Sequence, residues 1–140
     1  MALSLASRDR DRRAPLGLLA EAGCAIVVAT LAIRLRTFNR IARDLERASQ
    51  GAPADTDSAY WIRRSVGAWG HRLPWRAKCF EQGLAAAAML RRRGFAYEVH
   101  YGAVSHADAL KAHVWVTSGG SPVVGYENAA EHAELAVFKG

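Results

Sequence analysis

Cys79 is the residue of this chain best placed to act as a nucleophile. It lies where a loop is expected to enter a helix, and the free N–H groups and dipole at a helix N-terminus stabilise a thiolate. Arg76 and Lys78 add positive charge nearby. The other cysteine, Cys24, lies inside a hydrophobic run, and we expect it to be a small core residue.

His113 is the candidate general base. It opens a predicted strand with the sequence AHVWV, in which successive side chains point to opposite faces. If the alanine and the two valines face the core, His113 and Trp115 face the other side, where a helix start can present Cys79. A nucleophile on a helix N-terminus with a base on a neighbouring strand is one geometry for cysteine–histidine catalysis. Gln82, one turn along from Cys79, is a weaker candidate for lining the site or binding an oxyanion.

The first half of the chain has a helical pattern that would position Cys79. Residues 1–14 are polar and are expected to form a flexible tail, and residues 15–140 to form a single domain. The predicted helices cover residues 16–47 (with a bend near 37–39), 59–72 and 78–93, with a loop at 49–58. Ser58 is the expected N-cap of the second helix and Gly94 the stop after the third.

After Gly94 the hydrophobic period changes from about 3.6 to 2, which indicates strands. The predicted strands are 95–102, 112–117 and 122–127, with a polar loop at 103–110, a turn at 118–121 and a terminal element of undecided type at 132–138. A helical N-terminal half followed by a small antiparallel sheet is an α+β fold.

The segment Leu73–Ala85, LPWRAKCFEQGLA, resembles the nucleophile motif of lasso-peptide leader peptidases, which are transglutaminase-like cysteine peptidases. The resemblance continues through RRRG at 91–94, through AHVWV and through PVVG at 122–125, so it covers about Leu73 to Phe138. It implies a transglutaminase-like, papain-like domain with Cys79 as nucleophile and His113 as base. The residues Gln82, Trp75 and Trp115 are the accompanying candidates for substrate or oxyanion binding.

The resemblance also implies a function and its partners. Such enzymes cut the leader from a ribosomally made precursor before a cyclase resembling asparagine synthetase closes the macrolactam. The residues before Leu73 are predicted to be helical and show no winged-helix strands, so we expect a separate leader-recognition protein of winged-helix type. We expect no cofactor, and no metal because the spacing of Cys79 and the histidines matches no compact ligand pattern. We expect no nucleic-acid partner, because no nucleic-acid fold signature accompanies the arginines at 91–93.

One position departs from the family. Members often place an Asp twelve residues after the histidine, where this chain has Gly125. Glu127, two residues further, is a candidate replacement if the strand register brings it to His113; otherwise a backbone carbonyl or a water orients the imidazole. The missing carboxylate also keeps open an alternative function, a non-catalytic transglutaminase-like module that binds the precursor or a maturation partner.

Length, cysteine content, charge and hydropathy limit which kinds of protein this chain can be and where it can act. A chain of 140 residues excludes a multidomain enzyme, and two cysteines make no disulfide framework. The net charge of +6 is uneven, with +9 on residues 1–95 and −3 on the rest. The apolar stretch Leu16–Ile33 contains Glu21 and is short for a membrane span, so we expect a core helix in a cytoplasmic protein, with an interfacial helix as the alternative.

Overall fold

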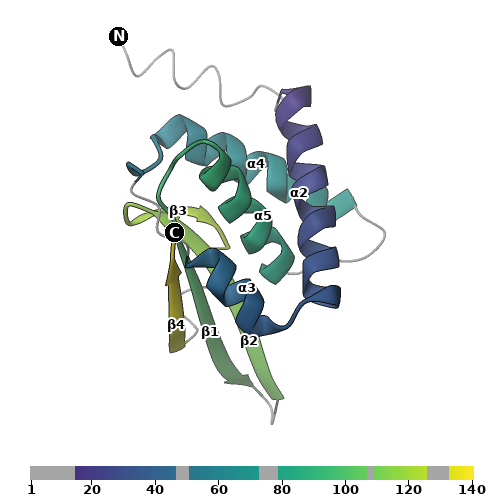
Figure 1. Ribbon diagram of the computed structural model, residues 1–140, viewed down its shortest axis with the longest axis vertical. Coiled ribbons are helices and arrows are strands. Elements are labelled where there is room, and N and C mark those ends of the chain that lie inside the picture. Colours follow the sequence, from purple (N-terminus) through teal and green to yellow (C-terminus); the bar gives the residue numbers. More distant parts are fainter. Residues whose placement is uncertain (1–14, 47–50, 73–78, 107–108, 126–132) are drawn as a thin grey trace.

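The computed structural model describes residues 15–46, 51–72, 79–106, 109–125 and 133–140. The helices come first: α2 (Leu16–Leu35), α3 (Phe38–Leu45), α4 (Thr56–Arg72) and α5 (Cys79–Arg92). The strands follow: β1 (Glu98–His106), β2 (Ala109–Ser118), β3 (Ser121–Val124) and β4 (Ala133–Lys139). The predicted α+β fold is therefore confirmed (Figure 1).

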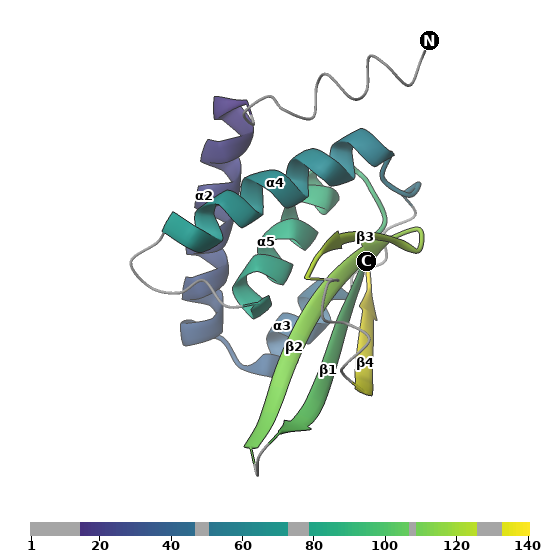
Figure 2. The ribbon, with the colours of Figure 1, turned by 180° about the vertical axis from the view of Figure 1, so that it is seen from behind.

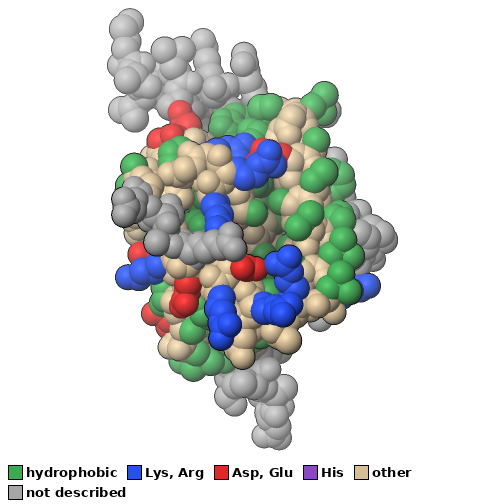
Figure 3. Space-filling model, in the orientation of Figure 1, with side chains coloured by type: hydrophobic (Ala, Val, Ile, Leu, Met, Phe, Trp, Pro, Cys, Tyr) green, Lys and Arg blue, Asp and Glu red, His purple; other side chains and the backbone are tan. Residues whose placement is uncertain are grey.

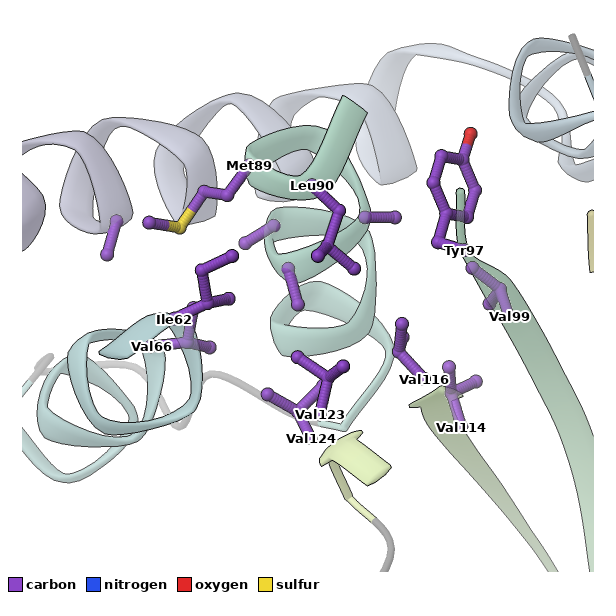
Figure 4. Packing of buried hydrophobic residues seen from close by; sticks show 14 of the residues in the cluster. Ile62, Val66, Met89, Leu90, Tyr97, Val99, Val114, Val116, Val123 and Val124 are labelled. Atoms are coloured by element: carbon purple, nitrogen blue, oxygen red, sulfur yellow. The ribbon is translucent and has the colours of Figure 1, made fainter. Parts of the chain in front are cut away.

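The strands form one antiparallel sheet in the order β3-β2-β1-β4. Figures 1 and 2 show α5 near the centre of the domain, where it contacts α2, α4 and β2, while α4 crosses both α2 and α5. Ala85, Ala86 and Ala87 in the middle of α5 are buried, so this helix approaches its neighbours closely. Figure 4 shows Met89 on the side of α5 toward Ile62 and Val66 of α4, and Leu90 on the side toward Tyr97, with the valines of β2 and β3 beneath them.

The expected first helix is two helices. Arg36 and Thr37 are extended, with ψ of 150° and 153°, and they separate α2 from α3 close to the predicted bend. The change of direction places Phe38 against three aromatic rings, those of Phe80, Tyr101 and Phe138, with centroid distances of 5.9–6.2 Å. Packing of this aromatic cluster favours the break although the sequence has no proline or glycine there.

The start of α4 corrects one prediction. The helix begins at Thr56, and Asp55, not Ser58, caps it. The carboxylate of Asp55 accepts hydrogen bonds from the Ser58 backbone N–H at 2.7 Å and from the Ser58 hydroxyl at 2.9 Å. These bonds hold the pKa of Asp55 below its ordinary value. Asp and Ser are both good caps, and the three-residue spacing to the Ser58 N–H decides in favour of the aspartate.

The end of α5 is as predicted, and the strand after it begins at Glu98 instead of residue 95. Gly94 has φ +73°, and the Phe95 N–H closes the helix on the carbonyl of Leu90 at 3.0 Å. Tyr97 and Val99 are buried, as the period-2 pattern requires.

The predicted loop at 103–110 is wrong. The β1–β2 pairing continues through His106 and Ala109, so the hairpin extends well past the helices (Figure 1). Its polar composition suggested a loop, but backbone pairing with the adjacent strand does not require an apolar face. The terminal element is the strand β4, and β3 is shorter than predicted.

α2 is packed on one side only. Its Glu21 carboxylate pairs with Arg93 at 2.6 Å, which lowers the pKa of Glu21, and the carbonyl of Leu19 accepts a hydrogen bond from the Trp69 indole at 2.6 Å. Cys24, however, is exposed on the other side, so its predicted place in the core is wrong. By length and composition alone, Leu16–Leu35 is the one described helix that could cross a membrane.

Candidate active site

Cys79 and His113 line one pocket of about 450 Å³. Cys79 is the first residue of α5, and His113 is in the middle of β2. The rest of the lining comes from α4, α5, β2 and the end of β3: Arg63, Gly67, Gln82, Val114, Val124 and Gly125. The two residues selected from the sequence, 34 positions apart, are therefore brought to the same place by the packing of α5 on β2.

The start of α5 lies unusually close to β2. Gly83, one turn after Cys79, faces Val114, and a Cβ at Gly83 would lie 2.7 Å from the Val114 Cγ1. Only glycine permits this approach without a shift of the helix. As a result, the Cys79 thiol is half-buried and its sulfur lies 3.9 Å from the carbonyl oxygen of Ala112, the residue before His113.

A backbone carbonyl orients the imidazole of His113. The Nε2 atom lies 2.6 Å from the oxygen of Gly125. A carbonyl oxygen only accepts hydrogen bonds, so Nε2 carries the proton and donates it. A neutral imidazole has a single N–H, which leaves Nδ1 as the acceptor.

The backbone conformation of Gly125 accounts for this contact. Gly125 has φ +72° and directly follows β3. The β2–β3 register shifts between Val116 and Thr117, so the chain reaches Gly125 through a strand irregularity. A Cβ at this position would lie 2.6 Å from the carbonyl oxygen of Val114. The residue that lacks the family's carboxylate is thus the one whose carbonyl contacts the histidine.

The cysteine on a helix start, the histidine on an adjacent strand and the oriented imidazole agree with the family comparison. A model of the Transglutaminase-like superfamily matches residues 25–138. The chain belongs to this superfamily. The match includes all the described lining residues of the pocket, and the superfamily includes cysteine peptidases. No curated protein and no solved structure gave a significant match to the chain.

In this transglutaminase-like domain, Trp115 supports the histidine from the side. The indole is buried, and its ring stacks on His113 with centroids 6.0 Å apart and on His100 with centroids 5.3 Å apart. His100 is held in turn by Glu134 and by the Thr117 hydroxyl. Trp115 therefore offers little surface to a substrate, and the three stacked rings restrict the orientation of the His113 imidazole.

The other predicted site residues fall into two groups. Gln82 does line the pocket, and its side chain lies so close to Gly70 of α4 that a Cβ there would be 2.6 Å from the Gln82 Nε2. Trp75 and Glu127 lie outside the described residues, so their roles stay predictions. Among the described residues, no group of three His, Cys, Asp or Glu side chains could hold a metal ion.

A second cavity, of about 390 Å³, lies between α2, α3 and α5. Its walls are mainly aliphatic and it contains neither Cys79 nor His113. It includes Cys24, but its described lining residues include no histidine to act as His113 could for Cys79. We therefore place the candidate chemistry in the pocket at the start of α5.

Two features of the site were missed by reasoning on the sequence. The first is Gly83. Its position one turn after Cys79, on the same face of the helix, could have indicated a close approach of the helix to a neighbouring strand. The second is the carbonyl of Gly125. Every residue has a backbone carbonyl, so the residue type does not show which carbonyl the chain conformation directs toward His113.

Restoring the family's aspartate with Gly125→Asp is expected to lower activity instead of raising it. An Asp here would adopt φ +72° and place its Cβ 2.6 Å from a carbonyl oxygen, at a cost of about 1–3 kcal/mol. The change would also displace the carbonyl that orients His113, and we expect at least a roughly tenfold lower rate of peptide cleavage. Circular dichroism of the variant checks that the fold survives.

Glu127→Gln is the matched comparison for Gly125→Asp. If the Gly125 carbonyl is the main partner of His113, this variant keeps more activity than Gly125→Asp. A loss in Glu127→Gln as large as that in Gly125→Asp would show that a carboxylate orients the imidazole.

Proposed function

We propose that this protein is a cysteine peptidase that removes the leader from a lasso-peptide precursor before the macrolactam is closed. The observation that carries the peptidase part is the pocket that Cys79 and His113 both line, with the His113 Nε2 held by the Gly125 carbonyl at 2.6 Å. That bond leaves Nδ1 as the proton acceptor, which is the tautomer a cysteine–histidine pair requires.

The proposed reaction has two steps. First, Nδ1 takes the Cys79 proton, the sulfur attacks the scissile carbonyl carbon, and the departing amine receives that proton from His113. The leader is now held as a thioester on Cys79. Second, His113 removes a proton from a water, the hydroxide attacks the thioester, and the thiolate leaves and is reprotonated. The products are a leader with a free carboxylate and a core peptide with a free amino terminus.

Several groups are placed to stabilise the tetrahedral intermediates. α5 begins at Cys79, which lines the pocket, and the first turn of a helix leaves its backbone N–H groups without partners in the helix. Gln82 projects from the same turn into the pocket. We propose Gln82 as an oxyanion donor, with the backbone N–H of the nucleophile itself as a second donor.

The choice of a lasso precursor as substrate rests on the sequence resemblance. The motif around Cys79, the RRRG segment that ends α5 and the His-Val-Trp triplet occur in the order and spacing of the leader peptidases. The same resemblance supports the proposed partners, a separate winged-helix leader-recognition protein and a cyclase resembling asparagine synthetase. Precursor maturation of this kind would take place in the cytoplasm.

Cleavage of a precursor by the purified protein tests this proposal. We expect mass spectrometry to show the freed core peptide, with a rate at least about tenfold higher when the winged-helix recognition protein is present, because it raises the local concentration of the leader. Equal rates with and without that protein would count against the partner.

Precursor binding without any cleavage, under conditions where the cysteines are reduced, would favour the alternative function. In that case the domain would be a non-catalytic transglutaminase-like module that holds the precursor for another enzyme.

A further inference from the structure

The outward face of α2 is apolar along nearly its whole length. The exposed side chains recur every three or four residues, so they share one face of the helix. They are Leu16, Ala20, Cys24, Val27, Val28, Leu31 and Leu35, which we call the α2 stripe. Cys24 and Val28, at one border of the stripe, also line the cavity between α2, α3 and α5. Val28, Leu31 and Leu35 are 64%, 51% and 80% exposed. Figure 3 shows hydrophobic side chains following α2 along one edge of the molecule.

A water-facing helix normally carries charged residues on this side. In α2 the only charged residues are Glu21 and Arg34, and Glu21 is turned toward Arg93 of the neighbouring helix. At about 1.5 Å per residue, the helix is roughly 30 Å long, so the uncharged stripe is a large exposed patch. Patches of this size mark surfaces that another molecule covers.

The opposite face of α2 belongs to the domain. Ala22, Ile26, Ala29 and Thr30 are buried, and the Trp69 indole donates to the Leu19 carbonyl. To be surrounded by lipid, α2 would have to separate from the rest of the domain. The stripe can therefore lie on a membrane, but α2 cannot cross one while the fold is intact.

Positive charge surrounds the C-terminal end of the stripe. Arg34 lies on the same face as Val27 and Leu31, seven and three residues before it, and Arg40 and Arg43 of α3 are exposed beyond it. Within the described part of the chain, these three arginines form no ion pair. Figure 3 shows Lys and Arg side chains gathered past this end of α2, and the whole chain carries +6.

We propose that the α2 stripe docks this protein on an anionic membrane surface. The aliphatic side chains would enter the boundary between headgroups and acyl chains, and Arg34, Arg40 and Arg43 would contact lipid phosphates. Apolar burial and attraction to anionic lipid together give the two signals that reversible membrane binding needs.

The charge pattern disfavours a second copy of the chain as the occupant. Parallel stripes would place Arg34 beside Arg34 and so bring like charges together. A specific protein partner is disfavoured because the stripe has no aromatic residue and, apart from one thiol, no hydrogen-bonding side chain before Arg34.

Vesicle flotation tests the proposal. We expect the full chain to float with vesicles of equal parts phosphatidylglycerol and phosphatidylcholine, to float less with phosphatidylcholine alone, and to be released by high salt. The double variant Val28→Glu, Leu31→Glu should bind the anionic vesicles at least about tenfold more weakly, since it removes two large apolar contacts. Both side chains are exposed, so the fold should tolerate these changes.

Leu135→Glu is the matched control, because Leu135 is 63% exposed but lies on β4, away from α2. It should bind vesicles as the wild type does. Cys79→Ala should also bind normally, which separates docking from peptidase activity.

Absence of vesicle binding by the wild type, or equal binding by the double variant, would overturn the proposal. So would a wild-type dimer that the double variant converts to a monomer in sedimentation, because that result would assign the stripe to a second copy.

Discussion

Replacing Cys79 with alanine is expected to reduce precursor cleavage by roughly three orders of magnitude or more. In the proposed mechanism the sulfur forms the thioester, and no other group in the described pocket can take its place. The change removes one half-buried atom at the start of α5, so the thermal unfolding curve should hardly move. Quantification of the freed core peptide by mass spectrometry measures the effect.

Cys24→Ala is the control for this prediction. Cys24 is exposed on α2 and far in sequence from the pocket at α5, so the variant should cleave at the wild-type rate. Retained cleavage in Cys79→Ala would remove the peptidase mechanism altogether, whereas loss in both variants would indicate a damaged fold.

His113→Ala is expected to lower the cleavage rate by about 10²–10⁴-fold, the usual contribution of a positioned general base. Removing the ring leaves a space between Trp115 and the Gly125 carbonyl in the pocket that Cys79 lines. Added imidazole should enter that space and restore part of the activity. Rescue of this kind would not occur if His113 only supported the fold.

His100→Ala provides the comparison, because His100 stacks on the far side of Trp115 and does not line the pocket. It should lower the rate by a smaller factor, and imidazole should not restore it. Equal losses in the two histidine variants, with no rescue in either, would contradict the role of His113 as base.

The site could be predicted from the sequence where local pattern determines structure. The run of helix-forming residues before Gly94 predicted a helix that starts next to Cys79. The observed α5 does begin at Cys79. His113 alternates with the buried Val114 and Val116 on β2, as the strand period predicted. Ala112, expected to share their place in the core, is exposed.

The features that could not be predicted depend on contacts between distant segments. The approach of α5 to β2 requires Gly83 to meet Val114, and the partner of His113 is a carbonyl aimed by the conformation of Gly125. Cys24 was misplaced for a related reason: the apolar composition of its helix indicated burial on all sides, whereas the domain covers only one. That discrepancy is also what identifies the α2 stripe.

The central claim is that His113 activates Cys79, and competitive alkylation of the two cysteines tests it most directly. The protein would be treated with limiting iodoacetamide near neutral pH, and the modification of each cysteine followed by peptide mass spectrometry. Exposure alone favours Cys24, because it is exposed and Cys79 is half-buried. We predict the opposite order, with Cys79 reacting faster in the wild type and losing that advantage in His113→Ala. Faster modification of Cys24 in the wild type, or no change in the Cys79 rate in His113→Ala, would contradict the account.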